Sequence, residues 1–190
     1  MPKIVKKISL YQAHVQKWGD CRRCELSKGR KKIVLLRGQL PCDVLFVGEA
    51  PGESEDVLGS PFVGPAGKLL DHIVKHAVDG HTVRYALTNL VGCFPKEAKG
   101  TGNHAPPDEA IKACSPRVDE VYRMAKPSVV VRVGSLASKW VDKLQDWEPG
   151  HTVDLVHPAA ILRADAVAQQ AEIDRSIVKL KTAIEAILPF

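Results

Sequence analysis

The stretch VLFVGEAPGESEDVLGSPFVGPAGKLLDHIV, residues 44–74, decides the fold. It opens with an apolar run, Val44–Val47, that is continuous enough for a buried strand of a parallel sheet. The run breaks at Gly48 and passes through a turn of small residues into an acidic segment. From about residue 66 to 78 the apolar spacing is that of a helix. This order is typical of α/β proteins, which gather functional residues in the loops beyond strand ends.

The same alternation of strand and helix continues on both sides of this stretch. We expect strands at residues 31–37, 43–48, 84–91, 128–133 and 153–156. We expect helices at residues 8–18, 66–78, 108–124, 136–144 and 165–187, with Asp108 as the N-cap of the third. Residues 95–107 are rich in Gly, Pro and Asn and predict a loop. Alternating strands and helices predict a parallel sheet covered on both faces.

Length and composition favour a single soluble globular domain over residues 1–190. The chain has 190 residues, 45% of them hydrophobic and 26% charged, which is enough to bury a core without disulfides. The N-terminal residues contain no apolar core of signal-peptide length, and no run approaches a membrane span. We therefore expect a cytoplasmic protein that does not bind a membrane. We also expect it to be a monomer.

Positive charge is concentrated near the N-terminus. The formal net charge is +5 and the isoelectric point about 9.0, an excess that suits a polyanionic partner. The first fifth of the chain holds only two acidic residues, Asp20 and Glu25, against Lys3, Lys6, Lys7, Lys17, Arg22, Arg23, Lys28, Arg30, Lys31, Lys32 and Arg37. An isolated run of this kind is more often a solvated basic face than a binding site.

Five cysteines in a chain expected to be cytoplasmic indicate metal or cluster ligation rather than disulfides. Cys21 and Cys24 form a C-x-x-C pair, which by itself fits half a zinc site, a redox pair or half a cluster site. Cys93 follows a predicted strand and Cys114 lies in the next helix, so both can approach the first pair. Four thiolates suit zinc or an iron–sulfur cluster equally, and the spacing alone does not choose between them.

Four motifs and these four cysteines together resemble family 4 of the uracil-DNA glycosylases, the iron–sulfur type. The motifs are GEAPGESED at 48–56, PFVGPAGKLL at 61–70, LTN at 87–89 and HPAAILR at 157–163. The resemblance covers nearly the whole chain and implies a three-layer α/β/α sandwich with a central, mostly parallel four-stranded sheet. It also implies a 4Fe-4S cluster on Cys21, Cys24, Cys93 and Cys114 that clamps the N-terminal arm. Cys42 matches no ligand and is expected to be structural.

The resemblance assigns a pocket for uracil that has been turned out of the DNA. Phe62 resembles the aromatic residue that stacks on the base. Asn89 looks like the residue that reads the base, since an amide offers both a donor and an acceptor to uracil O4 and N3–H. His157 lies by uracil O2 in the family and stabilises the anionic leaving group. The backbone of Ala50 and Gly52 is expected to line the same pocket.

The catalytic carboxylate is the weakest point of the match. In family 1 enzymes an Asp in the matching turn stations the attacking water, whereas this chain has Ala50, as family 4 members have a small residue there. Glu49 is the nearest carboxylate and our first candidate to orient water or stabilise positive charge on the sugar. Glu55 is the second candidate.

Contacts to DNA are expected from two further segments. Leu162 resembles the apolar wedge that fills the gap left by the extruded base, and Arg163 would hold a phosphate or stack. Gly134 and Ser135, at a helix start after a strand, offer backbone N–H groups to a phosphate. Beside such a site, the N-terminal basic residues favour phosphate contact.

The implied function is that of a monofunctional uracil-DNA glycosylase, which hydrolyses the N-glycosidic bond of deoxyuridine in base excision repair. Two departures keep an alternative open, a non-catalytic or DNA-crosslinking uracil-DNA-binding iron–sulfur protein. Cys93 is followed by Phe94–Pro95 rather than by the usual arginine–proline, and His104 stands where a crosslinking branch captures the sugar. Arg132, inside an apolar strand, is expected at a strand end facing DNA or a carboxylate, because an unpaired buried charge is costly.

Overall fold

A computed structural model of the protein describes residues 9–96, 105–144, 147–148 and 150–188. The described residues form one sheet in the order β1-β3-β2-β4-β5. The four longer strands, β2 (Val44–Gly48), β3 (Tyr85–Asn89), β4 (Val129–Val133) and β5 (His151–Leu155), are parallel to one another. The fifth, β1 (Arg37–Gly38), is antiparallel to β3. The expected sheet of four strands is therefore a sheet of five, mostly parallel.

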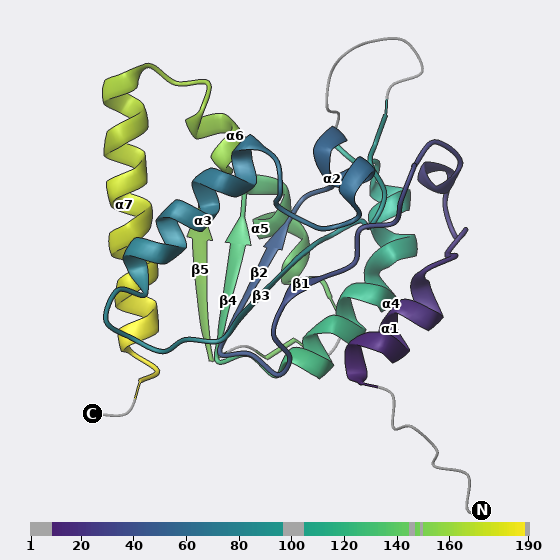
Figure 1. Ribbon diagram of the computed structural model, residues 1–190, viewed down its shortest axis with the longest axis horizontal. Helices are drawn as coiled ribbons and strands as arrows, with labels where there is room; N and C mark the ends of the chain where they lie inside the picture. Colours follow the sequence, from purple (N-terminus) through teal and green to yellow (C-terminus); the bar gives the residue numbers. More distant parts are fainter. Residues whose placement is uncertain (1–8, 97–104, 145–146, 149, 189–190) are drawn as a thin grey trace, which may run out of the picture.

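Helices cover both faces of the sheet, as Figure 1 shows. One face packs against α1 (Leu10–Trp18), α4 (Asp108–Ala125) and α5 (Ser135–Val141). The other packs against α3 (Pro65–Ala77), α6 (Pro158–Ile161) and α7 (Ala166–Glu185). Within β2, Leu45 and Val47 belong to the first core and Val44 and Phe46 to the second, because successive side chains of a strand point to opposite faces. The three-layer α/β/α prediction is confirmed.

The predicted strand at residues 31–37 is mostly wrong. Only Arg37 and Gly38 pair with β3, and residues 31–36 have no regular structure. Val34, Leu35 and Leu36 are nevertheless buried. The apolar run therefore indicates that these side chains belong to the core, not that their backbone pairs with a neighbouring strand. A short 3-10 helix, η1 (Glu25–Lys28), precedes this segment.

Two helix predictions also need correction. The acidic segment after Gly52 is a helix, α2 (Glu53–Leu58), although it has no apolar periodicity. The residue at the N-cap of α4 is Pro107, which lies just outside the helix, and Asp108 is the first helical residue. Asp108 still suits that place, because negative charge in the first turn interacts favourably with the helix dipole.

The topology places the ends of four strands together. Gly48 pairs with Asn89, and Val133 pairs with Leu155, so β2, β3, β4 and β5 all end at the same edge. The chain order reverses between β2 and β4, since β3 lies on one side of this pair and β5 on the other. Ligands of open α/β sheets bind at such a switch point. No helix among the described residues is long and apolar enough to cross a membrane.

Candidate active site

Two adjoining cavities lie at this edge of the sheet. The first cavity, of about 500 Å³, is lined by the residues after β2, by α2, by the loop before α3, by the end of β3 and by the segment after β5. The second cavity, of about 580 Å³, lies between the ends of β2, β4 and β5. Both are lined by Ala50, His157, Ala159 and Arg163. The cavities are therefore two compartments of one site.

Phe62 forms one wall of the first cavity. Its side chain is buried and its φ angle is +55°, a conformation that costs free energy for a residue with a Cβ and is concentrated at functional sites. The ring lies against Gly48, where a Cβ atom would come within 2.5 Å of the ring Cζ. Glycine at the end of β2 thus allows an aromatic ring to lie beside the strand end.

Asn89 meets Phe62 in the same cavity from the next strand. Its Oδ1 atom approaches the same glycine, 2.5 Å from where a Cβ of Gly48 would be. Asn89 is only 3% exposed, yet its side-chain amide forms no hydrogen bond with any residue that the structure describes. An amide held at a cavity wall in this way is available to a ligand, since buried polar groups are normally paired.

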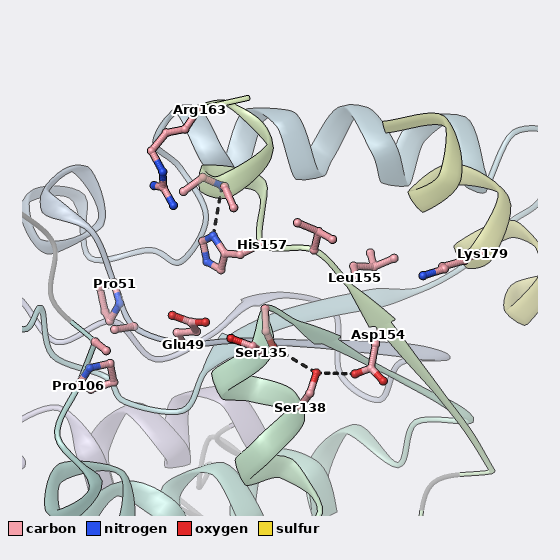
Figure 2. A pocket seen from close by; sticks show the side chains of 16 residues that line it. Glu49, Pro51, Pro106, Ser135, Ser138, Asp154, Leu155, His157, Arg163 and Lys179 are labelled. Atoms are coloured by element: carbon pink, nitrogen blue, oxygen red, sulfur yellow. Dashed lines mark hydrogen bonds between the residues drawn. The ribbon is translucent and has the colours of Figure 1, made fainter. Parts of the chain in front are cut away.

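His157 is the N-cap of α6, and its ring is oriented by that role. The Nδ1 atom accepts a hydrogen bond from the backbone N–H of Ala159 at 3.2 Å, drawn as a dashed line in Figure 2. Because Nδ1 is the acceptor, the proton of the neutral ring lies on Nε2. Burial lowers the pKa of His157, an effect that Glu49 opposes and Arg163 reinforces. The ring is therefore a neutral donor through Nε2 at neutral pH.

We expect His157 to titrate below the ordinary histidine value of about 6.5. Below pH 6.5 the unfolded chain then binds more protons than the folded one, so the free energy of unfolding should fall as the pH drops through this window and be constant above it. NMR of the ring nitrogens should find Nδ1 unprotonated at pH 7. An Asn replacement of His157 should remove this part of the pH dependence, and a midpoint above 6.5 would contradict the assignment.

Glu49 is placed across the second cavity from His157. Figure 2 shows His157 and Arg163 on one side and Glu49 and Ser135 on the other. The Oε1 atom of Glu49 accepts a weak hydrogen bond from the backbone N–H of Leu136 at 3.4 Å. It does not line the first cavity, so its carboxylate lies beside that cavity rather than within it.

The sequence predicts that Gly134 and Ser135 offer N–H groups to a phosphate. Both line the second cavity, but a Cβ on Gly134 would come within 2.6 Å of the Glu49 carboxylate. Gly134 has φ +95°, a conformation that favours glycine. The start of α5 therefore faces a carboxylate, whose charge opposes a phosphate at the same place.

Glu55 is fully engaged by the loop around the first cavity. Its carboxylate accepts hydrogen bonds from the backbone N–H groups of Gly52 at 3.0 Å, Val63 at 2.8 Å and Gly64 at 2.7 Å. These bonds tie the loop before α3 to α2 and so hold the segment that carries Phe62. Glu55 lines the cavity, but its oxygens are used in positioning the wall.

Leu162 and Arg163 follow α6 at the mouth of the first cavity. Leu162 is 43% exposed. Arg163 lines both cavities. The pair is therefore placed where a ligand would enter.

The four cysteines expected to act together line one small cavity. None of them forms a disulfide. Arg30 donates a hydrogen bond to the Sγ atom of Cys93 at 3.2 Å, and Arg117 donates one to the Sγ atom of Cys114 at 3.3 Å. Four sulfurs with two guanidinium donors are chemically suited to an anionic thiolate group. In the described parts of the chain, however, no three His, Cys, Asp or Glu side chains are arranged to hold a metal ion.

Comparison with known proteins decides the family. Residues 37–181 match the model of the uracil DNA glycosylase superfamily. The chain belongs to this superfamily. It is 33% identical over 177 residues to the type-4 uracil-DNA glycosylase of Pyrobaculum aerophilum, covering 82% of this chain and 86% of that protein. It is 36% identical over 122 residues to the type-4 enzyme of Sulfurisphaera tokodaii, covering 64% of this chain and 53% of that protein. The chain thus spans about half the length of some curated relatives.

Solved structures support the fold of this superfamily member. SMUG2 of Pedobacter heparinus superposes with a TM-score of 0.58 at 16% identity, covering 73% of this chain and 74% of that one. A protein of Methanosarcina acetivorans described as a putative uracil DNA glycosylase gives 0.54 at 13% identity, covering 80% and 98%. At these identities the likeness concerns the fold alone.

The structure gives two arginines of this uracil-DNA glycosylase superfamily member defined partners. Arg132 pairs with Asp154 and Asp142, so of the two partners expected for it the carboxylate is the one found. Arg117 is fully buried and contacts Cys114 and the backbone of Asn89. Its only signal in the sequence is its position three residues after a cysteine in a helix. Cys42 is buried and does not line the small cavity shared by the other four cysteines, and His104 lies outside the described residues.

Proposed function

We propose that this protein is a monofunctional uracil-DNA glycosylase, which hydrolyses the N-glycosidic bond of deoxyuridine in DNA and leaves an abasic site for base excision repair. One observation carries the proposal. Phe62, Asn89 and His157, which come from three distant segments, line the same cavity of about 500 Å³. A ring, an amide and an imidazole are the groups needed to stack on a pyrimidine, read its edge and stabilise its departure.

Base recognition is assigned to Phe62 and Asn89. An enzyme that acts on a base in DNA must take it out of the stack and hold it in a pocket. Stacking on the Phe62 ring compensates for the stacking lost in the duplex. The Asn89 amide, unpaired among the described residues, can accept from uracil N3–H and donate to O4. The backbone at Ala50 and Gly52 completes the wall of the cavity.

Catalysis is assigned to His157 and Glu49. As the bond breaks, negative charge develops on the base, and a neutral imidazole that donates through Nε2 stabilises this charge without changing its own charge state. Positive charge develops on the sugar at the same time, and the Glu49 carboxylate beside the cavity stabilises it or orients a water molecule. Ala50 does no acid–base work. Glu55 acts by holding the loop, since three backbone N–H groups already occupy it.

Uracil-containing DNA is the proposed partner, bound by a monomer in the cytoplasm. Leu162 is the proposed wedge, because it is exposed beside the cavity and apolar wedges fill gaps in stacked bases. Arg163 would contact a phosphate next to the extruded nucleotide. Gly134 and Ser135 lie beside the Glu49 carboxylate. A DNA phosphate bound by their N–H groups would have to lie away from that carboxylate, because the two negative charges repel each other.

Cys21, Cys24, Cys93 and Cys114 are the proposed ligands of a 4Fe-4S cluster. Their common cavity, the absence of disulfides and the donors Arg30 and Arg117 support this assignment. The cluster would join the N-terminal arm to α4 and supplies cross-linking rather than redox chemistry. Iron and acid-labile sulfide analysis of the purified protein tests this assignment directly.

We expect the iron-loaded protein to release uracil from a labelled oligonucleotide, so that alkali then cleaves the strand at the abasic site. The Asn89→Ala variant should be slower by orders of magnitude, and a thymine-containing oligonucleotide should not be cleaved. Tight binding to uracil-DNA without cleavage would favour the non-catalytic alternative. An adduct that resists denaturant would favour the crosslinking alternative.

A further inference from the structure

A strongly basic groove, which we call the basic groove, lies between the segment before β1 and the end of α2. It has a volume of about 650 Å³ and holds five basic side chains and one acidic side chain. These are Arg22, Lys28, Arg30, Lys31, Lys32 and Asp20. Neither cavity of the active site shares a lining residue with the basic groove.

Three of these cations have no counter-ion among the residues that the structure describes. Lys28 pairs with Glu25, and Arg30 is turned inward to the oxygen of Cys21 and the sulfur of Cys93. The charged groups of Arg22, Lys31 and Lys32, by contrast, make no ion pair with any residue that the structure describes, and all three are exposed. Like charges held together repel each other, so the arrangement favours an external anion.

The backbone beneath these cations is fixed. Asp56 in α2 is 3% exposed and accepts hydrogen bonds from the backbone N–H groups of Lys31 at 2.8 Å and Lys32 at 3.4 Å. The main chain of the two lysines is thereby held to α2. Both residues line the groove, where the Lys32 side chain lies against Gly59 at the end of α2. Such anchoring places the charges without neutralising them, because the carboxylate is buried beneath the backbone.

The basic groove is next to the first cavity along α2. Residues 52–55, at the start of α2, line the cavity, and Leu58 and Gly59, at its end, line the groove. Six helical residues span about 9 Å, and one strand of a duplex rises about 3.4 Å per nucleotide. A strand whose nucleotide enters the cavity would therefore reach the groove about three nucleotides away.

We propose that the basic groove binds backbone phosphates of the DNA strand, on the side of the extruded nucleotide away from Arg163. The proposal rests on the proposed function for its choice of DNA as the polyanion. It adds a second anchoring point, which carries no base specificity because phosphate contacts position a protein without reading sequence. Arg22, Lys31 and Lys32 are the residues that neutralise the phosphates.

The salt dependence of DNA binding tests the proposal. Each phosphate contact contributes about 0.9 to the slope of log affinity against log salt for duplex DNA. The triple variant Arg22→Gln, Lys31→Gln, Lys32→Gln should lower this slope by about two to three, measured by fluorescence anisotropy on a uracil-free duplex. A matched triple variant, Lys75→Gln, Lys126→Gln, Lys181→Gln, removes the same charge from residues that line neither the basic groove nor the two cavities, and it should leave the slope unchanged.

The possible results distinguish a failure of the basic-groove proposal from a failure of the proposed function. An unchanged slope in the first variant, or an equal fall in both, would overturn the proposal. The double variant Lys31→Gln, Lys32→Gln, which leaves the segment between Cys21 and Cys24 intact, should still lower the slope by about two at unchanged iron content. Wild-type protein that binds with the full slope but releases no uracil would refute the proposed function and leave the groove standing. If the triple variant lowered the salt slope for an RNA duplex but not for a DNA duplex, the choice of DNA as the ligand would be wrong.

Discussion

Replacement of His157 by alanine should slow uracil release by about 10²–10³-fold, the usual effect of removing one preorganised donor to a developing anion. The same substitution removes the side chain that accepts from the Ala159 N–H. Loss of an N-cap of this kind lowers the free energy of unfolding by about 1 kcal/mol. The rate is measured in single-turnover reactions and the stability by denaturant unfolding of the same preparations.

His157→Asn separates the two roles of this residue. Asparagine is among the best N-cap residues, so it should recover most of the stability that alanine loses. Its short amide cannot place a donor where the Nε2 atom of the imidazole lies, and the rate should stay as low as in the alanine variant. An asparagine variant that regains both stability and rate would show that His157 acts only by capping α6.

The position of the active site could be predicted from the sequence, because the carboxyl ends of parallel strands meet at one edge. Glu49, Asn89 and Gly134 each end or directly follow an apolar run, and His157 comes two residues after another. Once the runs are parallel and adjacent, these residues must lie near one another. No pairwise contact had to be known for this prediction.

The division of labour among the acidic residues could not be predicted in the same way. Glu53, Glu55 and Asp56 are close in sequence and chemically alike, yet two are buried and take different backbone partners. Which N–H groups a carboxylate meets depends on how distant loops close, and that closure leaves no local pattern. For the same reason α2 was missed, since its stability derives from these bonds rather than from an apolar face.

Arg117 gives the second large expected effect. Its side chain is fully buried and donates hydrogen bonds to the oxygens of Leu35, Thr88 and Asn89 and to the sulfur of Cys114. Arg117→Met has a similar length but would remove the Arg117 donors from Thr88, Asn89 and Cys114, whereas the Leu35 oxygen would still accept from the Thr88 hydroxyl. A buried polar group left without its partner costs about 1–3 kcal/mol, so the midpoint of denaturant unfolding should fall steeply.

Arg117→Lys tests the geometry of this network separately from its charge. Lysine keeps a positive charge but offers a compact ammonium in place of a planar fork of donors. It cannot reach the sulfur on one side and the two backbone oxygens on the other, so its stability should lie between those of the wild type and the methionine variant. Equal stability of all three proteins would contradict the role assigned to Arg117.

The network also predicts that the contribution of Arg117 to stability depends on Cys114. Of its four partners only Cys114 can carry negative charge, and a buried guanidinium without an anion nearby is costly. In a Cys114→Ser background the loss caused by Arg117→Met should therefore differ from that in the wild type by about 0.5–3 kcal/mol, the range found for residues in contact. Additive losses would mean that the sulfur does not stabilise the charge. A coupling of this size would mean that the four-cysteine site helps to position the backbone of Asn89, because the Arg117 side chain contacts both Cys114 and the Asn89 carbonyl.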